Sequence, residues 1–152
     1  MDAARGVLEW TGSMSWRHRN RYRLLSDRIA SLSGSHPDAL ADAQAVADAA
    51  VKRGDRRYHA RALLVAAGIQ ARAGQPVDQE QLGELVERFL PLCGPDGWRD
   101  LAELAAAVGS EGVWRLAEKQ AAAVVAEVSA QPGIDADRAN RAIRHQVDRL
   151  KP

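Results

Sequence analysis

The sequence predicts an all-α protein, built as an α-solenoid of about three helix-turn-helix repeats with a C-terminal capping helix. Three observations predict it. Helix-favouring residues, with alanine first, dominate the 152 residues. β-branched residues never alternate with polar ones over the length of a strand. Turn residues recur along the chain and leave segments of helical length between them.

The first half of the chain holds three expected helices, after an N-terminal segment (1–14) in which a short helix within 2–10 is expected. They cover roughly 15–33, 38–53 and 56–73, and each is followed by a glycine suited to the left-handed position after a helix: Gly34, Gly54 and Gly74. Asp38 stands where a side-chain oxygen can cap the second helix.

The second half of the chain holds four more expected helices. A helix over 78–92 begins at Asp78, and Pro91 should end or kink it near Leu90. A helix over 97–108 ends before Gly109. Helices over 111–130 and 135–150 begin at the capping residues Ser110 and Asp135.

Several features recur 40 residues apart. Gly34 and Gly74 share this spacing, as do Asp38 and Asp78. His18, Tyr58 and Trp98 form a series at the same interval. A fixed period of this length is typical of helical repeats. The chain is therefore expected to be one domain (1–152) with repeats at 15–54, 55–94 and 95–132 and a capping helix at 135–150.

An apolar stripe at helical spacing predicts the buried face of the first helix: His18, Tyr22, Leu25, Ile29 and Leu32. The third helix repeats it with Tyr58, Ala62, Val65 and Ile69. Arg17, Arg21 and Arg28 lie on one flank of the first stripe, whereas Arg19 and Arg23 lie on another face. The arginines thus form no continuous basic patch, which argues against nucleic acid as a partner.

Trp16 lies nearly opposite this stripe. A solenoid helix buries two faces, so Trp16 is expected to pack on Val7 and Leu8 of the preceding segment.

No arrangement of residues predicts catalysis, a cofactor or a metal. The four histidines lack the spacing of a helical metal site, and there is no phosphate-binding loop or nucleophile elbow. The single cysteine, Cys93, cannot form an internal disulfide, which favours a reducing, cytoplasmic location. No apolar run is long enough to span a membrane. The formal net charge is +1.

Two segments of the chain resemble a known family of helical repeats. The segment Arg57 to Leu64, ending at Ala73-Gly74, and the segment Gly97 to Leu104 are similar to the tetratricopeptide-like repeats of bacterial signalling ATPases and transcriptional regulators. The resemblance covers roughly residues 15–130. The period departs from it, because the usual repeat is about 34 residues long. The resemblance implies binding of a protein or peptide, or sensing of a ligand for an effector domain.

The function predicted from these features is protein–protein interaction, as a scaffold or regulatory module that is not an enzyme. The residues expected to bind the partner are Trp16, Arg17 and Arg21, together with an acidic ridge of Glu80, Glu84 and Glu87. Two alternatives stay open. One is a small-molecule-sensing regulatory domain with a pocket between the first helices. The other is a structural module that associates with itself as a homo-oligomer.

Overall fold

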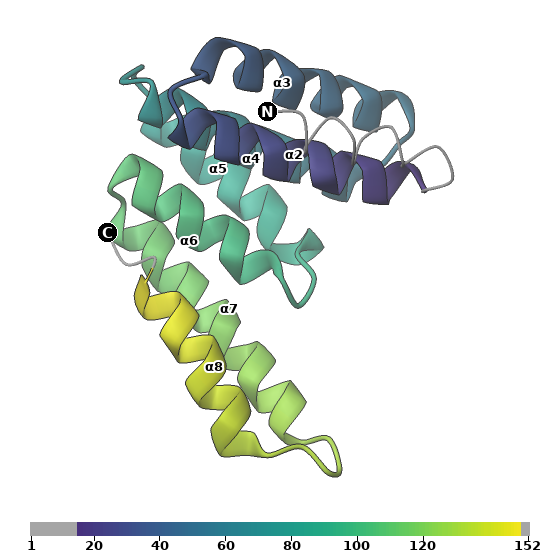
Figure 1. Cartoon of the computed structure of the whole chain (residues 1–152), viewed down its shortest axis with the longest axis vertical. Helices are drawn as coiled ribbons and strands as arrows, with labels where there is room; N and C mark the ends of the chain where they lie inside the picture. Colours follow the sequence, from purple (N-terminus) through teal and green to yellow (C-terminus); the bar gives the residue numbers. More distant parts are fainter. Residues whose placement is uncertain (1–14, 150–152) are drawn as a thin grey trace. The chain divides into compact units, whose positions relative to one another are not determined.

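The computed structural model describes residues 15–149 and is helical throughout, which confirms the all-α prediction (Figure 1). No strand occurs in this part of the chain. The elements are α2 (Trp16–Leu32), α3 (His36–Lys52), α4 (Arg56–Arg72), α5 (Gln79–Phe89), the short 3-10 helix η2 (Leu90–Leu92), α6 (Gly97–Val108), α7 (Glu111–Ser129) and α8 (Ala136–Arg149). The expected helix within 2–10, and the packing of Trp16 on Val7 and Leu8, lie outside the described residues.

The chain divides into two compact units, residues 1–78 and 79–152, and each is described by itself. In the first, α2, α3 and α4 pack against one another. In the second, α7 packs against both α6 and α8. The helix pairs of the first and third predicted repeats, α2 with α3 and α6 with α7, are thus in contact. The organisation as one repeat domain stays a prediction.

The helix ends follow the predicted turn chemistry. The glycines at 34, 54, 74 and 109 all have positive φ, between 65° and 90°, as the left-handed position requires. The Ser110 side chain caps α7 through the Val113 N–H, and Asp135 accepts from the N–H of Arg138. The prediction for Asp38 is wrong. Pro37 fits the first turn of a helix, so α3 begins at His36 and Asp38 lies inside it.

Small side chains dominate the core of the first unit. Its buried apolar cluster is Leu24, Ala39, Ala43, Val46, Ala47, Ala62, Val65, Ala66 and Ile69. The predicted stripe of the third expected helix is confirmed, because Tyr58, Ala62, Val65 and Ile69 are all buried in α4. Alanine on facing helices lets their backbones approach closely, so this core depends on close packing of backbones more than on large side chains.

The second unit uses larger side chains. Trp98, Leu101 and Leu104 of α6 are buried, as is Trp114 of α7. Pro91 ends the regular helix as predicted: α5 stops at Phe89 and continues as η2.

In α8 the arginines at 138, 141, 144 and 149 are exposed, and Ala139 and Ile143 are half-buried. Among residues 15–149, no helix has both the length and the low charge that crossing a bilayer requires.

Candidate interaction surface

Helix α2 buries a polar face. Its buried residues are Asn20, Leu24, Asp27 and Ser31, at steps of four, three and four. The Asn20 amide donates to the Trp16 carbonyl oxygen at 2.8 Å. The Ser31 hydroxyl donates to the Arg28 carbonyl oxygen at 2.9 Å. Each donor is therefore satisfied by its own helix, and burial does not cost these groups their hydrogen bonds.

Asp27 is the exception on this face. It is 6% exposed, and its Oδ2 atom has no hydrogen-bond partner. The pKa of Asp27 is raised to about 7, mainly by burial and further by the negative charge of Asp42 on α3, with Arg23 partly offsetting both effects. Arg23 donates from Nε to Asp42 Oδ2 at 3.1 Å and from its second guanidinium nitrogen to Oδ1. The α2–α3 contact thus contains two carboxyls and one guanidinium.

The opposite face of α2 exposes a row of large apolar side chains. We call it the α2 seam: Tyr22 (42% exposed), Leu25 (48%), Ile29 (57%) and Leu32 (72%). The sequence-based prediction that this stripe faces the core is wrong. His18, the first residue of that stripe, is exposed as well and contacts the Ser15 hydroxyl.

The physical reason lies in the neighbouring helix. The buried face of α3 is built from small residues such as Ala39, Ala43 and Ala47, which share one cluster with Leu24 of α2. Against such a surface the short side chains Asn20 and Ser31 allow close approach, and they satisfy their polar atoms locally. A second periodic signal, at positions 20, 24, 27 and 31, was present in the sequence but was masked by the more apolar stripe.

Arginines flank the α2 seam. Arg19 and Arg21 are exposed and Arg28 is half-buried. The other two arginines form ion pairs with neighbouring parts of the chain. Arg17 pairs with Asp55 at the start of α4, and Arg23 pairs with Asp42. The arginines therefore combine interhelical pairing with a basic border to the apolar row.

Trp16, expected to bind a partner, anchors α2 to α4. Its ring meets Tyr58 edge to face, with centroids 5.5 Å apart, and the Arg53 guanidinium lies 5.2 Å from its centroid. Trp16 is half-buried. Of the residues predicted in this unit, Arg21 lies on the exposed border of the seam, whereas Trp16 and Arg17 are engaged with α3 and α4.

The acidic ridge belongs to the second unit. Glu80, Glu84 and Glu87 are exposed on α5. Glu84 forms an ion pair with Arg88 on the same helix, at 3.3 Å. Exposed pairs of this kind contribute little to stability.

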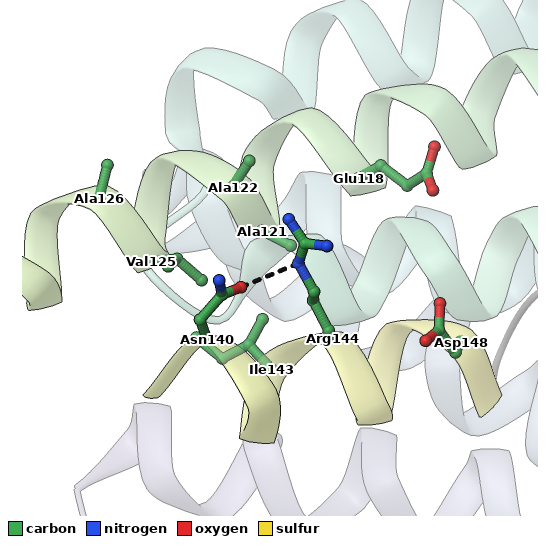
Figure 2. A pocket seen from close by; sticks show the side chains of 9 residues that line it. All are labelled: Glu118, Ala121, Ala122, Val125, Ala126, Asn140, Ile143, Arg144 and Asp148. Carbon is green, nitrogen blue, oxygen red and sulfur yellow. Dashed lines mark hydrogen bonds between the residues drawn. The ribbon is translucent and has the colours of Figure 1, made fainter. Parts of the chain in front are cut away.

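An open groove of about 490 Å³ runs between α7 and α8. Figure 2 shows a floor of small and aliphatic side chains, among them Ala121, Ala122 and Val125 from α7 and Ile143 from α8. The Arg144 side chain lies along it and donates from Nε to Asn140 Oδ1 at 2.9 Å. Glu118 and Asp148 lie toward one end. A second groove, of about 400 Å³, lies between α3 and α4 in the first unit.

Groups suited to catalysis are sparse in the part of the chain that is described. Residues 15–149 contain no cluster of three histidine, cysteine or carboxylate side chains that could hold a metal ion. The half-buried Cys93 thiol lies 3.0 Å from the Leu90 carbonyl oxygen and 3.8 Å from Gln120 Oε1.

Comparison with family models, with curated proteins and with solved structures finds no match to this chain. The geometry of the described residues therefore carries the functional argument.

Proposed function

We propose that this protein is a binding module whose α2 seam docks another protein. One observation carries the proposal: four large apolar side chains lie exposed in a row on a helix that buries polar residues on its other side. Scattered exposed apolar residues are normal, but a contiguous row bordered by polar groups is typical of an interaction site. The resemblance to tetratricopeptide-like repeats, a regulatory role and a cytoplasmic location belong to the same proposal.

Binding, not catalysis, is the proposed role because the part of the chain that the structure describes gathers no three histidine, cysteine or carboxylate side chains into one site. The perturbed carboxyl of the first unit, Asp27, faces away from it, toward α3. The seam offers apolar contact area and the arginine border offers charge, which together suit recognition of a protein surface.

Site-specific photo-crosslinking tests the proposal. A photoreactive residue replaces Leu25 in the seam or, as a control, the equally apolar and exposed Val51 on α3 (59% exposed). Both proteins are produced in the native host and irradiated. We expect a discrete heteromeric adduct from position 25 that is absent from position 51 and is lost when Ile29 is also changed to Asp. Identical adducts from both positions, or none from either, would contradict a docking role for the seam.

The α7–α8 groove supports a second candidate, a small-molecule sensor. Its volume of about 490 Å³ falls in the range of ligand pockets, and an apolar floor beside the Arg144 guanidinium suits a small carboxylate with an apolar body. Titration with such carboxylates should then give saturable NMR shift changes near Ala122 that disappear in Arg144→Gln. Changes that do not saturate, or that survive this substitution, would argue against it.

A further inference from the structure

We infer that Asp27 makes the attachment of α2 to α3 depend on a proton: α2 stays packed while Asp27 holds the proton, and it separates more readily once the proton is released to water. This dependence concerns how α2 is held, not what binds its seam, and so goes beyond the proposed function. The charges at the contact, the burial of Asp27 and its place between the other contacts support it in turn.

The charges at the contact between α2 and α3 are unbalanced. Asp27 brings a carboxyl from α2 and Asp42 brings another from α3, and Arg23 brings the guanidinium that acts on both. Two guanidinium nitrogens of Arg23 donate to the two carboxylate oxygens of Asp42. One positive charge cannot neutralise two carboxylates, so a protonated, neutral Asp27 balances the contact.

Burial favours the same protonated form. Asp27 is 6% exposed, and its Oδ2 atom has no hydrogen-bond partner. A buried carboxylate that lacks donors is costly, and the neutral acid avoids most of that cost. Burial and the charge of Asp42 together outweigh Arg23 and raise the pKa of Asp27 to about 7. Asp27 therefore changes its charge close to neutral pH.

Other charged groups of α4 and its start lie farther from Asp27. From α4, Arg72 donates to the Ser31 hydroxyl at 3.4 Å, one helical turn beyond Asp27. The ion pair of Arg17 with Asp55 lies near the start of α2, ten residues before Asp27, or roughly 15 Å along the helix. The two charges next to Asp27 are thus the ones that shift its pKa.

The position of Asp27 on α2 connects its charge to the attachment of the helix. Leu24, with the partly buried Ala30, packs on the apolar cluster of the first unit, and the Arg23 pair adds a polar contact to α3. Asp27 lies three residues from both Leu24 and Ala30. Loss of its proton would leave a poorly solvated charge between these contacts, and separation of α2 would return that charge to water.

The size of the effect follows from the two pKa values. In a separated α2 the carboxyl meets water and takes its ordinary pKa of 3.8, against about 7 in the packed helix. The proton stabilises the packed helix fully below pH 3.8, and this contribution is lost as pH rises to about 7. Over that window, each pH unit raises the ratio of separated to packed α2 by up to about tenfold. Above it, the ratio levels off.

Fluorine NMR of the full chain labelled with 5-fluorotryptophan tests the inference. Trp16 reports on α2, because its ring lies 5.5 Å from that of Tyr58 on α4. Trp98 and Trp114, in the second unit, are internal references, and single Trp→Phe variants assign the resonances. Relaxation dispersion measures the separated fraction at pH 5.0 and 7.5. We expect the ratio reported by Trp16 to rise by up to about 70-fold, with no matching change at the references.

Three variants assign the effect to Asp27. Asp27→Asn should remove it. Asp42→Asn should lower the pKa of Asp27, read from its carboxyl carbon shift, because Arg23 can then pair with Asp27, and α2 should stay packed at pH 7.5. Asp48→Asn removes the same charge from an exposed position of α3 and should behave as wild type. Histidine side chains also change charge over this range, and the residual pH dependence of Asp27→Asn measures what the histidines at 18, 36 and 59 contribute.

Two kinds of result would overturn the inference. An Asp27 carboxyl that titrates near its ordinary value of 3.8 would show that the packed helix holds a charged Asp27. Titration near pH 7 without a change at Trp16, or with an equal change at Trp98 and Trp114, would show that the proton does not control α2 in particular. Neither result bears on the docking role of the α2 seam, which photo-crosslinking tests separately.

Discussion

Arg17 and Asp55 join the start of α2 to the start of α4: Arg17 Nε lies 2.8 Å from Asp55 Oδ2. The other carboxylate oxygen, Oδ1, accepts the Tyr58 N–H at 3.2 Å and so caps α4. Burial raises the pKa of Asp55, but the hydrogen bonds from Arg17 and from the Tyr58 N–H outweigh burial, and the pKa lies below its ordinary value. One carboxylate therefore serves both as a helix cap and as an interhelical partner.

This double role predicts unequal effects of its two partners. Asp55→Ala should lower the free energy of unfolding by about 1–2 kcal/mol, the usual cost of losing a cap. Arg17→Ala should cost less than about 1 kcal/mol because Arg17 is largely exposed. Asp55→Asn, which retains a capping oxygen, should resemble Arg17→Ala. Urea unfolding measures all three, and an equal loss in Arg17→Ala and Asp55→Ala would refute the capping role.

The same substitution at two isoleucines separates the core from the α2 seam. Ile69 is fully buried in α4, so Ile69→Asp should place an uncompensated carboxylate in the core and cost several kcal/mol, a large part of a domain's stability. Ile29 is 57% exposed, and Ile29→Asp should change stability by less than about 0.5 kcal/mol. Thermal melts compare them. Similar melting temperatures for the two variants would show that the two faces are wrongly assigned.

Asp27 predicts a loss of stability as pH rises. Its pKa is about 7 in the folded chain against 3.8 ordinarily, so the folded state holds the proton more tightly. The stabilising contribution is fully present below pH 3.8 and is lost as pH rises to about 7. The change is at most about 1.4 kcal/mol per pH unit. Asp27→Asn should therefore gain stability over wild type steadily between pH 5 and 7. Parallel stability curves for the two proteins over this range would rule out the effect.

Two helix glycines should respond in opposite directions. A Cβ on Gly97, at the start of α6, would collide with the Cys93 side chain, so Gly97→Ala should destabilise by roughly 1–3 kcal/mol. At Gly83 in α5, a Cβ meets nothing within 4 Å, and Gly83→Ala should stabilise by about 0.5–1 kcal/mol. The midpoints of denaturant unfolding show whether each variant is more or less stable than the wild type. A stabilising Gly97→Ala would mean that the Cys93 turn yields easily.

The fold was predictable from the sequence where one signal dominated. In α4 the apolar stripe and the buried face coincide, and Val65 and Ile69 are buried as expected. Gly74 and Ser110 carry local backbone geometry that depends only on neighbouring residues, so their roles were predicted too. Such signals need no knowledge of the rest of the chain.

The candidate site was not predictable in the same way. Periodicity assigns the more apolar face of α2 to the core, but the alanine surface of α3 receives the smaller, polar face around Leu24. The partners of Arg17 and Arg23 lie on other helices, and helical spacing alone does not identify them. The capping role of Asp55, which directly follows the turn glycine Gly54, was not predicted either.

The sparse apolar attachment of α2 has a consequence for its hydrogen exchange. Leu24 is the one apolar residue that α2 buries, whereas α4 buries a nearly continuous run from Tyr58 to Ile69. Segments with few buried apolar contacts open at a lower free energy than the rest of their domain. The amides of α2 should therefore exchange sooner than those of α4. Because a ligand that binds the closed form adds to its stability, occupancy of the seam would slow exchange in the helix that carries it.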